Sequence, residues 1–249
     1  MSLEPTSADI IQLAWARHLG LADTAFAESV AKIAAGGNGG GIATRILRID
    51  PSAREVTFIR LFGCSALVGP DWVIDAAAGL PDEELAQHVT LLSLTRSYGG
   101  HGGGSAALFF ADDLPLIQAA EELTVSHGNP EAIELEGLCP PDDVHEAGIS
   151  ELEHRFTIMH SEDNGPRYPV ACGAYGEWEG FLAHMGVLVP PQLRRNGLGT
   201  LAASIAAHEA LAAGYTLQWR ADVSNKGSLA LARSLGFVTG GLEATVMLG

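Results

Sequence analysis

The stretch VPPQLRRNGLGT, residues 189–200, decides the fold of this chain. It follows a nearly continuous apolar run, which predicts a central strand at residues 181–189 that is buried on both faces. Pro190 and Pro191 end that strand, because proline cannot donate to a ladder. Apolar residues at helical spacing then predict a long helix at residues 197–213. The stretch is therefore predicted to join a buried strand to the N-terminus of a helix.

This strand-to-helix loop has the composition of an anion site. Backbone N–H groups at a helix start, aided by the helix dipole, attract anions. Gly197 and Gly199 have no Cβ, so phosphate oxygens can approach the backbone closely. Arg194 and Arg195 supply a local positive field, in a chain with only 14 basic residues. The loop is therefore predicted to cradle a phosphate or pyrophosphate group.

The overall charge limits the partners. The 249 residues carry 30 acidic and 14 basic side chains, a net charge of −16. Such a chain repels nucleic acid and anionic membranes, so we expect neither as a partner and expect a cationic amine or basic peptide instead. No apolar run approaches the roughly 18 residues of a membrane span, and no signal-peptide pattern is present.

Cysteine and histidine usage gives no metal or disulfide framework. The three cysteines are scattered and form no C-x-x-C, so a reducing, cytoplasmic location is expected. His208-Glu209 lacks the second histidine of H-E-x-x-H, and no metal site is predicted.

In the rest of the chain, proline and glycine residues indicate where helices, strands and loops begin and end. Two glycine runs at 36–41 and 99–104 are predicted as flexible loops, and one helix is predicted at 81–97. Asn129 is predicted to cap a helix, and Gly186 indicates a bulge or a close backbone approach. Strands are predicted at 42–49, 55–62, 105–110, 123–126, 156–160, 168–175, 216–221 and 244–248. The expected fold is α/β with a mixed sheet, in an N-terminal region at 1–115 and a second domain at 123–249.

The loop and its surroundings resemble the GNAT superfamily of acyl-CoA-dependent N-acyltransferases. The run RRNGLG at 194–199 matches the family signature Q/R-x-x-G-x-G/A. Asn225-x-x-Ser228, followed by LGF at 235–237, is similar to the family's N-x-x-A … L-G-F stretch, and the predicted element order agrees. The resemblance implies a GNAT fold over about the last half of the chain. The first 110 or so residues lie outside the usual GNAT core, and three alternatives stay open for them: a lid, a dimer arm or a degenerate GNAT-like half, as in glycine-N-acyltransferase-like relatives.

The resemblance also implies a reaction and a ligand. An amine would attack the thioester carbonyl of acetyl-CoA directly, and no metal would take part. The main chain near Val187 would bind the pantetheine arm and polarise the carbonyl, and Asn225 would reach the pantetheine or the acyl region. The residues expected to bind the co-substrate are Val187, Leu188, Val189, Arg194, Arg195, Asn196, Gly197, Leu198, Gly199, Thr200 and Asn225.

The catalytic groups depart from the family pattern. The usual general-acid tyrosine is replaced by Ala232, which leaves only Ser228, a weak acid, on that helix. The usual base position is Met185, and its neighbour His184 would face the same side only if a bulge at Gly186 re-aimed it. The candidates for base or amine anchor are His184, Glu177 and Glu179.

Two other functions compete with acetyl transfer. Gly197-x-Gly199-x-x-Ala202 with Asp222 also matches a dinucleotide fingerprint. However, seven residues separate the strand from its first glycine, and too few residues follow for a dinucleotide domain. The second alternative is a catalytically degenerate module that binds acyl-CoA or a partner protein. Because dimers are common among GNAT proteins, a homodimer also stays open.

Overall fold

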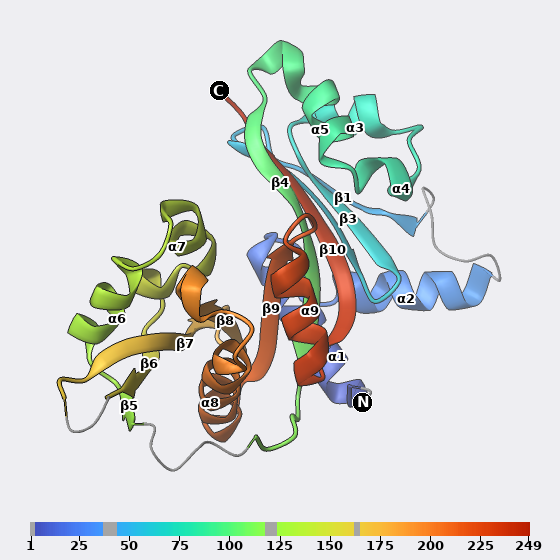
Figure 1. Cartoon of the computed structure of the whole chain (residues 1–249). Coiled ribbons are helices and arrows are strands. Elements are labelled where there is room, and N and C mark those ends of the chain that lie inside the picture. The colour runs from blue at the N-terminus through green and yellow to red at the C-terminus, as the bar shows by residue number, and fades with distance from the viewer. Residues whose placement is uncertain (1–2, 37–43, 118–123, 162–164) are drawn as a thin grey trace. The chain divides into compact units, whose positions relative to one another are not determined.

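The computed structural model describes residues 3–36, 44–117, 124–161 and 165–249, in two compact units (Figure 1). We call the first the C-terminal unit, which consists mainly of Phe110–Trp219 and Ala230–Val238. The second, the N-terminal unit, consists of Glu4–Phe109, Arg220–Leu229 and Thr239–Gly249. The compact units are therefore not continuous in sequence, whereas the limits 1–115 and 123–249 stay a prediction. No helix of the described ranges is long and apolar enough to cross a membrane.

The C-terminal unit is a sheet with helices on both faces. Its strand order is β9-β8-β7-β6-β5, antiparallel except for the parallel pair β8–β9. Helix α6 packs on one face through Leu135, and α8 packs on the other through Ala202. The elements are β5 (Thr124–Ser126), α6 (Asn129–Glu136), α7 (Pro141–Ala147), η3 (Ile149–Glu151), β6 (His154–His160), β7 (Tyr168–Trp178), β8 (Leu182–Leu188), η4 (Pro191–Leu193), α8 (Leu198–Ala212), β9 (Thr216–Asp222, up to Trp219 in this unit) and α9 (Lys226–Leu235, from Ala230 in this unit).

Helix α8 approaches β7 closely because small residues line both surfaces. A Cβ added at Gly173 would lie 2.0 Å from the carbonyl oxygen of Ala202, so only glycine fits there. The fully buried residues of the helix include Ala202, Ala203 and Ala206. This close packing fixes the axis of α8, and with it the direction of its N-terminus.

Strands β7 and β8 form a hairpin with a continuous register. The loop between the paired residues Trp178 and Leu182 is three residues long, and the N–H of Phe181 donates to the carbonyl of Trp178 at 3.2 Å. Glu179 and Gly180, the central residues of this turn, both have positive φ, 53° and 75°. The predicted bulge at Gly186 is not found, because every described pair from Trp178–Leu182 to Cys172–Leu188 follows one register. The close approach is confirmed: a Cβ at Gly186 would lie 2.5 Å from the carbonyl oxygen of Ala147 in α7.

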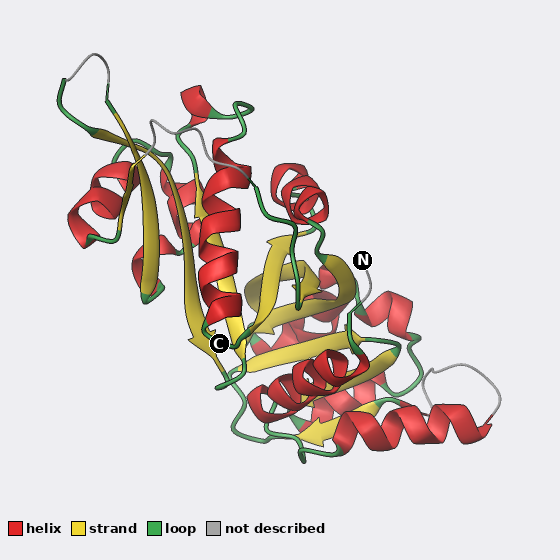
Figure 2. Ribbon diagram, turned by 90° about the horizontal axis from the view of Figure 1, so that it is seen from below, coloured by secondary structure: helices red, strands yellow, loops and turns green. Residues whose placement is uncertain are grey.

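Among its described residues, the N-terminal unit contains five neighbouring strands of a sheet, and one of them is β10, which comes from the far end of the sequence. Its strand order is β1-β3-β2-β10-β4, and β10 pairs antiparallel with β2. Ala244 and Val246 of β10 are fully buried in one core with Val56 and Phe58 of β2. The elements are α1 (Pro5–His18), α2 (Ala25–Gly36), β1 (Ile46–Ile49), β2 (Glu55–Leu61), β3 (Cys64–Gly69), α3 (Asp71–Ala77), α4 (Asp82–Leu85), α5 (His88–Thr95), η2 (Arg96–Tyr98), β4 (His101–Ala111) and β10 (Val238–Met247). Figure 2 shows these helices and strands coloured by type.

Several local predictions for this half are wrong. The glycine run at 99–104 is not a flexible loop, because β4 begins at His101 and a Cβ at Gly103 would lie 2.0 Å from the carbonyl oxygen of Thr245. The helix predicted at 81–97 is two helices, α4 and α5, separated at Gln87. The sequence did not predict α1, α2, β3 or α3. In the first glycine run, residues 37–41 lie outside the described residues.

The cap of α6 also differs from the prediction. Gly128 occupies the N-cap position, and no side chain makes a cap hydrogen bond there. Asn129 is the first helical residue, and its Oδ1 accepts a hydrogen bond from Arg155 at 2.7 Å. The asparagine therefore ties α6 to β6 instead of capping the helix.

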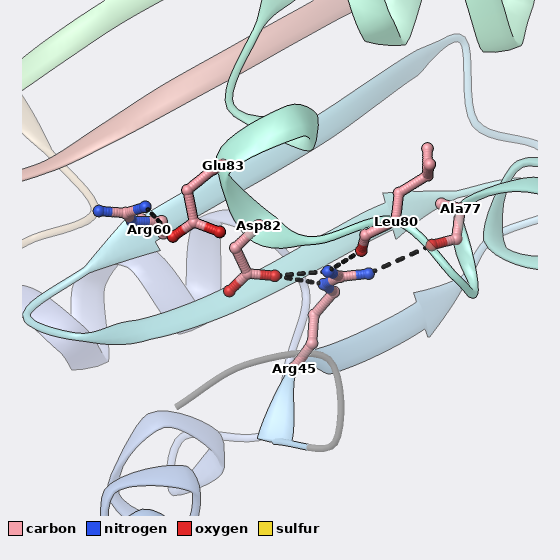
Figure 3. Close-up of polar contacts among 6 residues, drawn as sticks. All are labelled: Arg45, Arg60, Ala77, Leu80, Asp82 and Glu83. Carbon is pink, nitrogen blue, oxygen red and sulfur yellow. Dashed lines mark hydrogen bonds and ion pairs between the residues drawn. The ribbon is translucent and has the colours of Figure 1, made fainter. Parts of the chain in front are cut away.

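A buried ion pair holds α4 in the N-terminal unit (Figure 3). The guanidinium of Arg45 donates to Asp82 Oδ1 from Nε and Nη2 at 2.8 and 2.5 Å, and its Nη2 also donates to the carbonyl of Leu80 at 2.7 Å. The two side chains are only 2% and 12% exposed. The neighbouring pair Arg60–Glu83, at 3.2 Å, is 45% and 76% exposed. The same helix thus carries one buried and one exposed ion pair.

We expect the two ion pairs to contribute very differently to stability. Asp82→Asn leaves the Arg45 guanidinium buried without a counter-charge, and this should cost about 3–5 kcal/mol of unfolding free energy. The matched change Glu83→Gln should cost less than about 1 kcal/mol, because water solvates the exposed Arg60. Urea unfolding of both variants measures the difference. Equal losses would contradict a buried, charge-dependent contact at Asp82.

Candidate functional site

The cradle loop, residues 194–200, lies between the end of β8 and the start of α8. Strand β8 ends at Leu188, η4 follows, and α8 begins at Leu198 with Gly197 at its N-cap. Gly197 has φ 79°, and Arg195 has φ 67°, a left-handed conformation that costs a non-glycine residue about 1–2 kcal/mol. Strained backbone of this kind clusters at functional sites. The loop geometry therefore supports a role beyond connecting two elements.

The cradle loop has room for an anion at its backbone. A Cβ added at Gly197 would meet nothing within 4 Å, and one at Gly199 would meet only side chains, at 3.5 Å or more. By helix geometry the N–H groups of Leu198, Gly199 and Thr200 have no acceptor within α8. Open space and converging N–H donors are what a phosphate group needs at a helix start. The residues present thus fit a pyrophosphate.

The two arginines of the cradle loop have different roles. Arg194 Nη2 donates to Asp143 Oδ2 of α7 at 2.6 Å, and its Nε donates to the carbonyl of Val189 at 3.0 Å. Arg195 is exposed, and among the hydrogen bonds and ion pairs of the described residues its side chain takes part in none. Arg195 is therefore the available cation, whereas Arg194 ties the loop to α7.

The edge of β8 beside the cradle loop extends beyond its pairing with β9. Within the described residues, the parallel ladder covers three pairs, from Leu182–Thr216 to His184–Gln218. Val187 and Leu188 lie beyond these pairs, and so does Val189, whose carbonyl already accepts from Arg194. The Val189 carbonyl is already occupied by Arg194, whereas Val187 and Val189 lie beyond the pairs with β9. The N–H groups of Val187 and Val189 are therefore better placed to bind a ligand than this carbonyl.

Three predicted polar residues take part in structural hydrogen bonds, two through their side chains and Ser228 through its backbone N–H. Asn225 Oδ1 accepts a hydrogen bond from the Ser228 N–H at 2.9 Å, so Asn225 caps α9. Both residues belong to the N-terminal unit. Asn196 Nδ2 donates to the carbonyl of Leu193 at 3.3 Å and closes the loop before Gly197. Their ligand roles stay predictions.

Glu177 and Glu179 lie at the hairpin end of β8, opposite the cradle loop. Glu177 pairs in register with Ala183, about 16 Å along the strand from Leu188 at the usual rise. Its Oε2 accepts a hydrogen bond from the hydroxyl of Tyr215 at 2.6 Å, and this bond raises the pKa of Tyr215. Glu179 is an exposed turn residue. Their role as base or amine anchor stays a prediction.

Of the remaining positions in this unit, His184 stays a predicted base, and Ala232 offers no acid. His184 alternates with Met185 in a continuous register, so its side chain points to the face covered by α7 and η3 and is not re-aimed. The side chain of Ala232 is a methyl group and cannot donate a proton, and because Ala232 is fully buried, a tyrosine there would overpack the core. The described residues also contain no group of three or more ligating side chains that could hold a metal ion.

A shallow pocket of about 530 Å³ lies on the helical layer of the same unit. It is formed by the end of α6, by α7 and by η3. Glu136 in its wall already accepts hydrogen bonds from the N–H and Oγ of Ser150, at 3.0 and 2.5 Å. The pocket is therefore a surface groove with an occupied carboxylate, and it adds no donor to the cradle loop.

Comparison with known proteins places this geometry in a family. The model of the Acetyltransferase (GNAT) family matches residues 126–237. No curated protein matches the chain in sequence.

Solved structures give a weak likeness. A GNAT-family acetyltransferase from Novosphingobium aromaticivorans is 16% identical, with 60% of this chain and 67% of that chain covered and a TM-score of 0.46. A GCN5-related N-acetyltransferase from Kribbella flavida is 17% identical, with 64% of this chain and 63% of that chain covered and a TM-score of 0.42. A GNAT-family acetyltransferase from Colwellia psychrerythraea is 11% identical, with 65% of this chain and 62% of that chain covered and a TM-score of 0.45. This chain thus spans about two thirds or less of their length.

The matched segment contains β6 to β9, α8 and the whole cradle loop, in the predicted order. The fold and the family expected from the run at 194–199 are thereby confirmed. Residues 126–237 of this chain form an acetyltransferase domain of the GNAT family.

Proposed function

We propose that the protein is an N-acetyltransferase that moves an acetyl group from acetyl-CoA to an amine by direct attack. The observation that carries this proposal is the cradle loop. It combines open space at Gly197, the N–H groups of the first turn of α8, and the exposed cation Arg195 in a chain of net charge −16. A local anion site in so acidic a protein calls for a phosphorylated ligand.

The chain's own groups would hold and activate this co-substrate. The N–H groups of Leu198, Gly199 and Thr200, with Arg195, would bind the pyrophosphate. A main-chain N–H of β8 near Val187 would polarise the thioester carbonyl, as an oxyanion hole does. The amine nitrogen then forms the C–N bond, and the C–S bond breaks to release the CoA thiolate. The acidic surface favours a cationic amine or a basic peptide as acceptor.

The second candidate is a degenerate module that binds acyl-CoA without transferring the acyl group. The buried Ala232 at the family's acid position and Met185 at its base position favour this alternative. We expect either function to be carried out in a reducing cytoplasm, without metal, nucleic acid or membrane. A homodimer is compatible with both.

Release of the CoA thiol distinguishes the two functions. The protein is incubated with acetyl-CoA and spermidine, lysine or a lysine-rich peptide, and free thiol is followed with a chromogenic disulfide. The proposal predicts release that depends on one of the amines, with mass spectrometry showing the acetylated product. Binding of acetyl-CoA without transfer to any amine would favour the degenerate module.

A further inference from the structure

Helix α7 of the C-terminal unit reaches the cradle loop through one ion pair. Arg194 Nη2 donates to Asp143 Oδ2 at 2.6 Å, and Arg194 Nε donates to the carbonyl of Val189 at 3.0 Å. One guanidinium therefore joins the first turn of α7, the residue that follows β8 and the start of the cradle loop. The sequence predicted Arg194 as a ligand of the co-substrate, and it gave no role to Asp143.

Helix α7 is a fixed support for this ion pair, because the helix also packs on β8. A Cβ added at Gly186 of β8 would lie 2.5 Å from the carbonyl oxygen of Ala147, the last residue of α7. Val144 and Ala147 pack against a core cluster that contains Leu188, the last residue of β8. Strand β8, the cradle loop and α7 thus form a closed circuit of contacts, which the ion pair completes.

The backbone that follows Arg194 requires such support. Arg195 has φ 67° and Gly197 has φ 79°, so two left-handed residues lie within three positions of Arg194. A non-glycine residue keeps this conformation only where surrounding contacts hold it. These contacts include the two hydrogen bonds of Arg194 and the bond from Asn196 Nδ2 to the carbonyl of Leu193 at 3.3 Å. The ion pair therefore helps to hold the loop in the shape that opens the first N–H groups of α8 to an anion.

We propose that Asp143 is a positioning residue of the co-substrate site, which holds the cradle loop in its anion-binding conformation through Arg194. The inference rests on the proposed function, because its ligand is acetyl-CoA. A carboxylate repels a pyrophosphate, so Asp143 acts on the loop and does not touch the ligand. A loop that is already ordered binds more tightly, because ordering it does not reduce the free energy of binding.

Two other roles for Asp143 lead to different expectations. The first is local, because Asp143 lies in the first turn of α7, where a carboxylate interacts favourably with the helix dipole. Asp142 lies in the same turn and is exposed, so it shares this role without the bond to Arg194. The second role is competition, in which Asp143 occupies Arg194 until a phosphate group displaces it. Removal of Asp143 would then strengthen the binding of acetyl-CoA.

The sign of the change in affinity separates positioning from these roles. Asp143→Ala removes a negative charge beside an anion site, and by charge alone this strengthens the binding of acetyl-CoA. Competition for Arg194 predicts the same direction. Positioning predicts the opposite direction, because Arg194 loses its anchor on α7 and the cradle loop must be ordered when the ligand binds. A loss of affinity therefore cannot come from the removed charge.

Calorimetric titration with acetyl-CoA compares Asp143→Ala with the matched control Asp142→Ala. We expect the affinity of Asp143→Ala to fall about 10-fold, whereas Asp142→Ala should stay within about twofold of the wild-type protein. With spermidine, lysine or a lysine-rich peptide as acceptor, the KM for acetyl-CoA should rise about 10-fold in Asp143→Ala. Its kcat at saturation should not change, because Asp143 touches no reacting group. A variant that was damaged only in its folding would lose kcat together with its active fraction.

A double-mutant cycle tests whether Asp143 acts through Arg194. Arg194→Gln should weaken the binding of acetyl-CoA by a similar factor, because it breaks the same ion pair from the other side. In that background Asp143→Ala should cost no further affinity, since two changes that remove one contact are not additive. Losses that add in the double variant would mean that Asp143 does not act through Arg194.

The outcomes separate this inference from the proposed function. Equal affinities of Asp143→Ala and Asp142→Ala, a gain of affinity in Asp143→Ala, or additive losses in the cycle would overturn the role of Asp143 alone. Wild-type protein that binds acetyl-CoA but acetylates none of the amines would overturn acetyl transfer, and the calorimetric comparison would still decide the role of Asp143. Wild-type protein that binds no acetyl-CoA would overturn both.

Discussion

Placing two carboxylates in the cradle loop, by Arg195→Glu with Gly197→Glu, should lower the affinity for acetyl-CoA at least about 100-fold. The first change removes the exposed cation, and the second fills the open space with a negative charge. Each lost charge-assisted hydrogen bond is worth about 1.5–3 kcal/mol, and the new carboxylates repel the pyrophosphate. Isothermal titration calorimetry measures the loss directly.

Two controls keep this result interpretable. Gly197→Ala imposes the strain of a left-handed residue, about 1–2 kcal/mol, without adding charge, and should bind acetyl-CoA far better than the double variant. Arg54→Glu makes the same charge reversal at an exposed residue of the N-terminal unit and should bind normally. Unchanged affinity in the double variant, with the fold intact by circular dichroism, would reject the cradle loop as the pyrophosphate site.

Val246→Lys should abolish stable folding of the N-terminal unit, although residue 246 lies three residues from the C-terminus. Val246 is fully buried in the core that β10 shares with β2, beside Val56 and Phe58. An ammonium group there has no partner, and its desolvation costs several kcal/mol, a large part of a domain's stability of about 5–15 kcal/mol. Urea unfolding and limited proteolysis of the full chain measure the effect.

The next residue provides the matched control. Met247 is 39% exposed on the opposite face of β10 and pairs with Glu55, so Met247→Lys should be neutral or slightly stabilising. If Val246→Lys unfolded at the same urea concentration as Met247→Lys, β10 would not be part of the core of the N-terminal unit.

The sequence predicted the elements around the cradle loop well, because proline and glycine mark their ends. Pro190 and Pro191 end β8, and the single helix α8 follows at the expected place. The N-terminal half was predicted poorly. Glycine at 102–104 indicated a loop, whereas the glycines are required by the contact of Gly103 with Thr245, more than 100 residues later. Local composition contains no information on such a contact.

The same limit applies to the candidate site. The run at 194–199 predicted the anion site, but it could not distinguish the two arginines. Arg194 pairs with Asp143, 51 residues earlier, and only the fold brings these side chains together. Spacing identifies a site built from one continuous loop, and it misses groups that the topology assembles.

Calorimetric titration of the wild-type protein with acetyl-CoA, with NADH as the comparison ligand, shows whether the cradle loop belongs to a CoA site. Both molecules contain a pyrophosphate, but only acetyl-CoA contains the pantetheine arm that the edge of β8 would bind. We expect acetyl-CoA to bind at micromolar concentration and NADH not to bind. Absence of acetyl-CoA binding, or NADH binding of equal strength, would contradict this expectation.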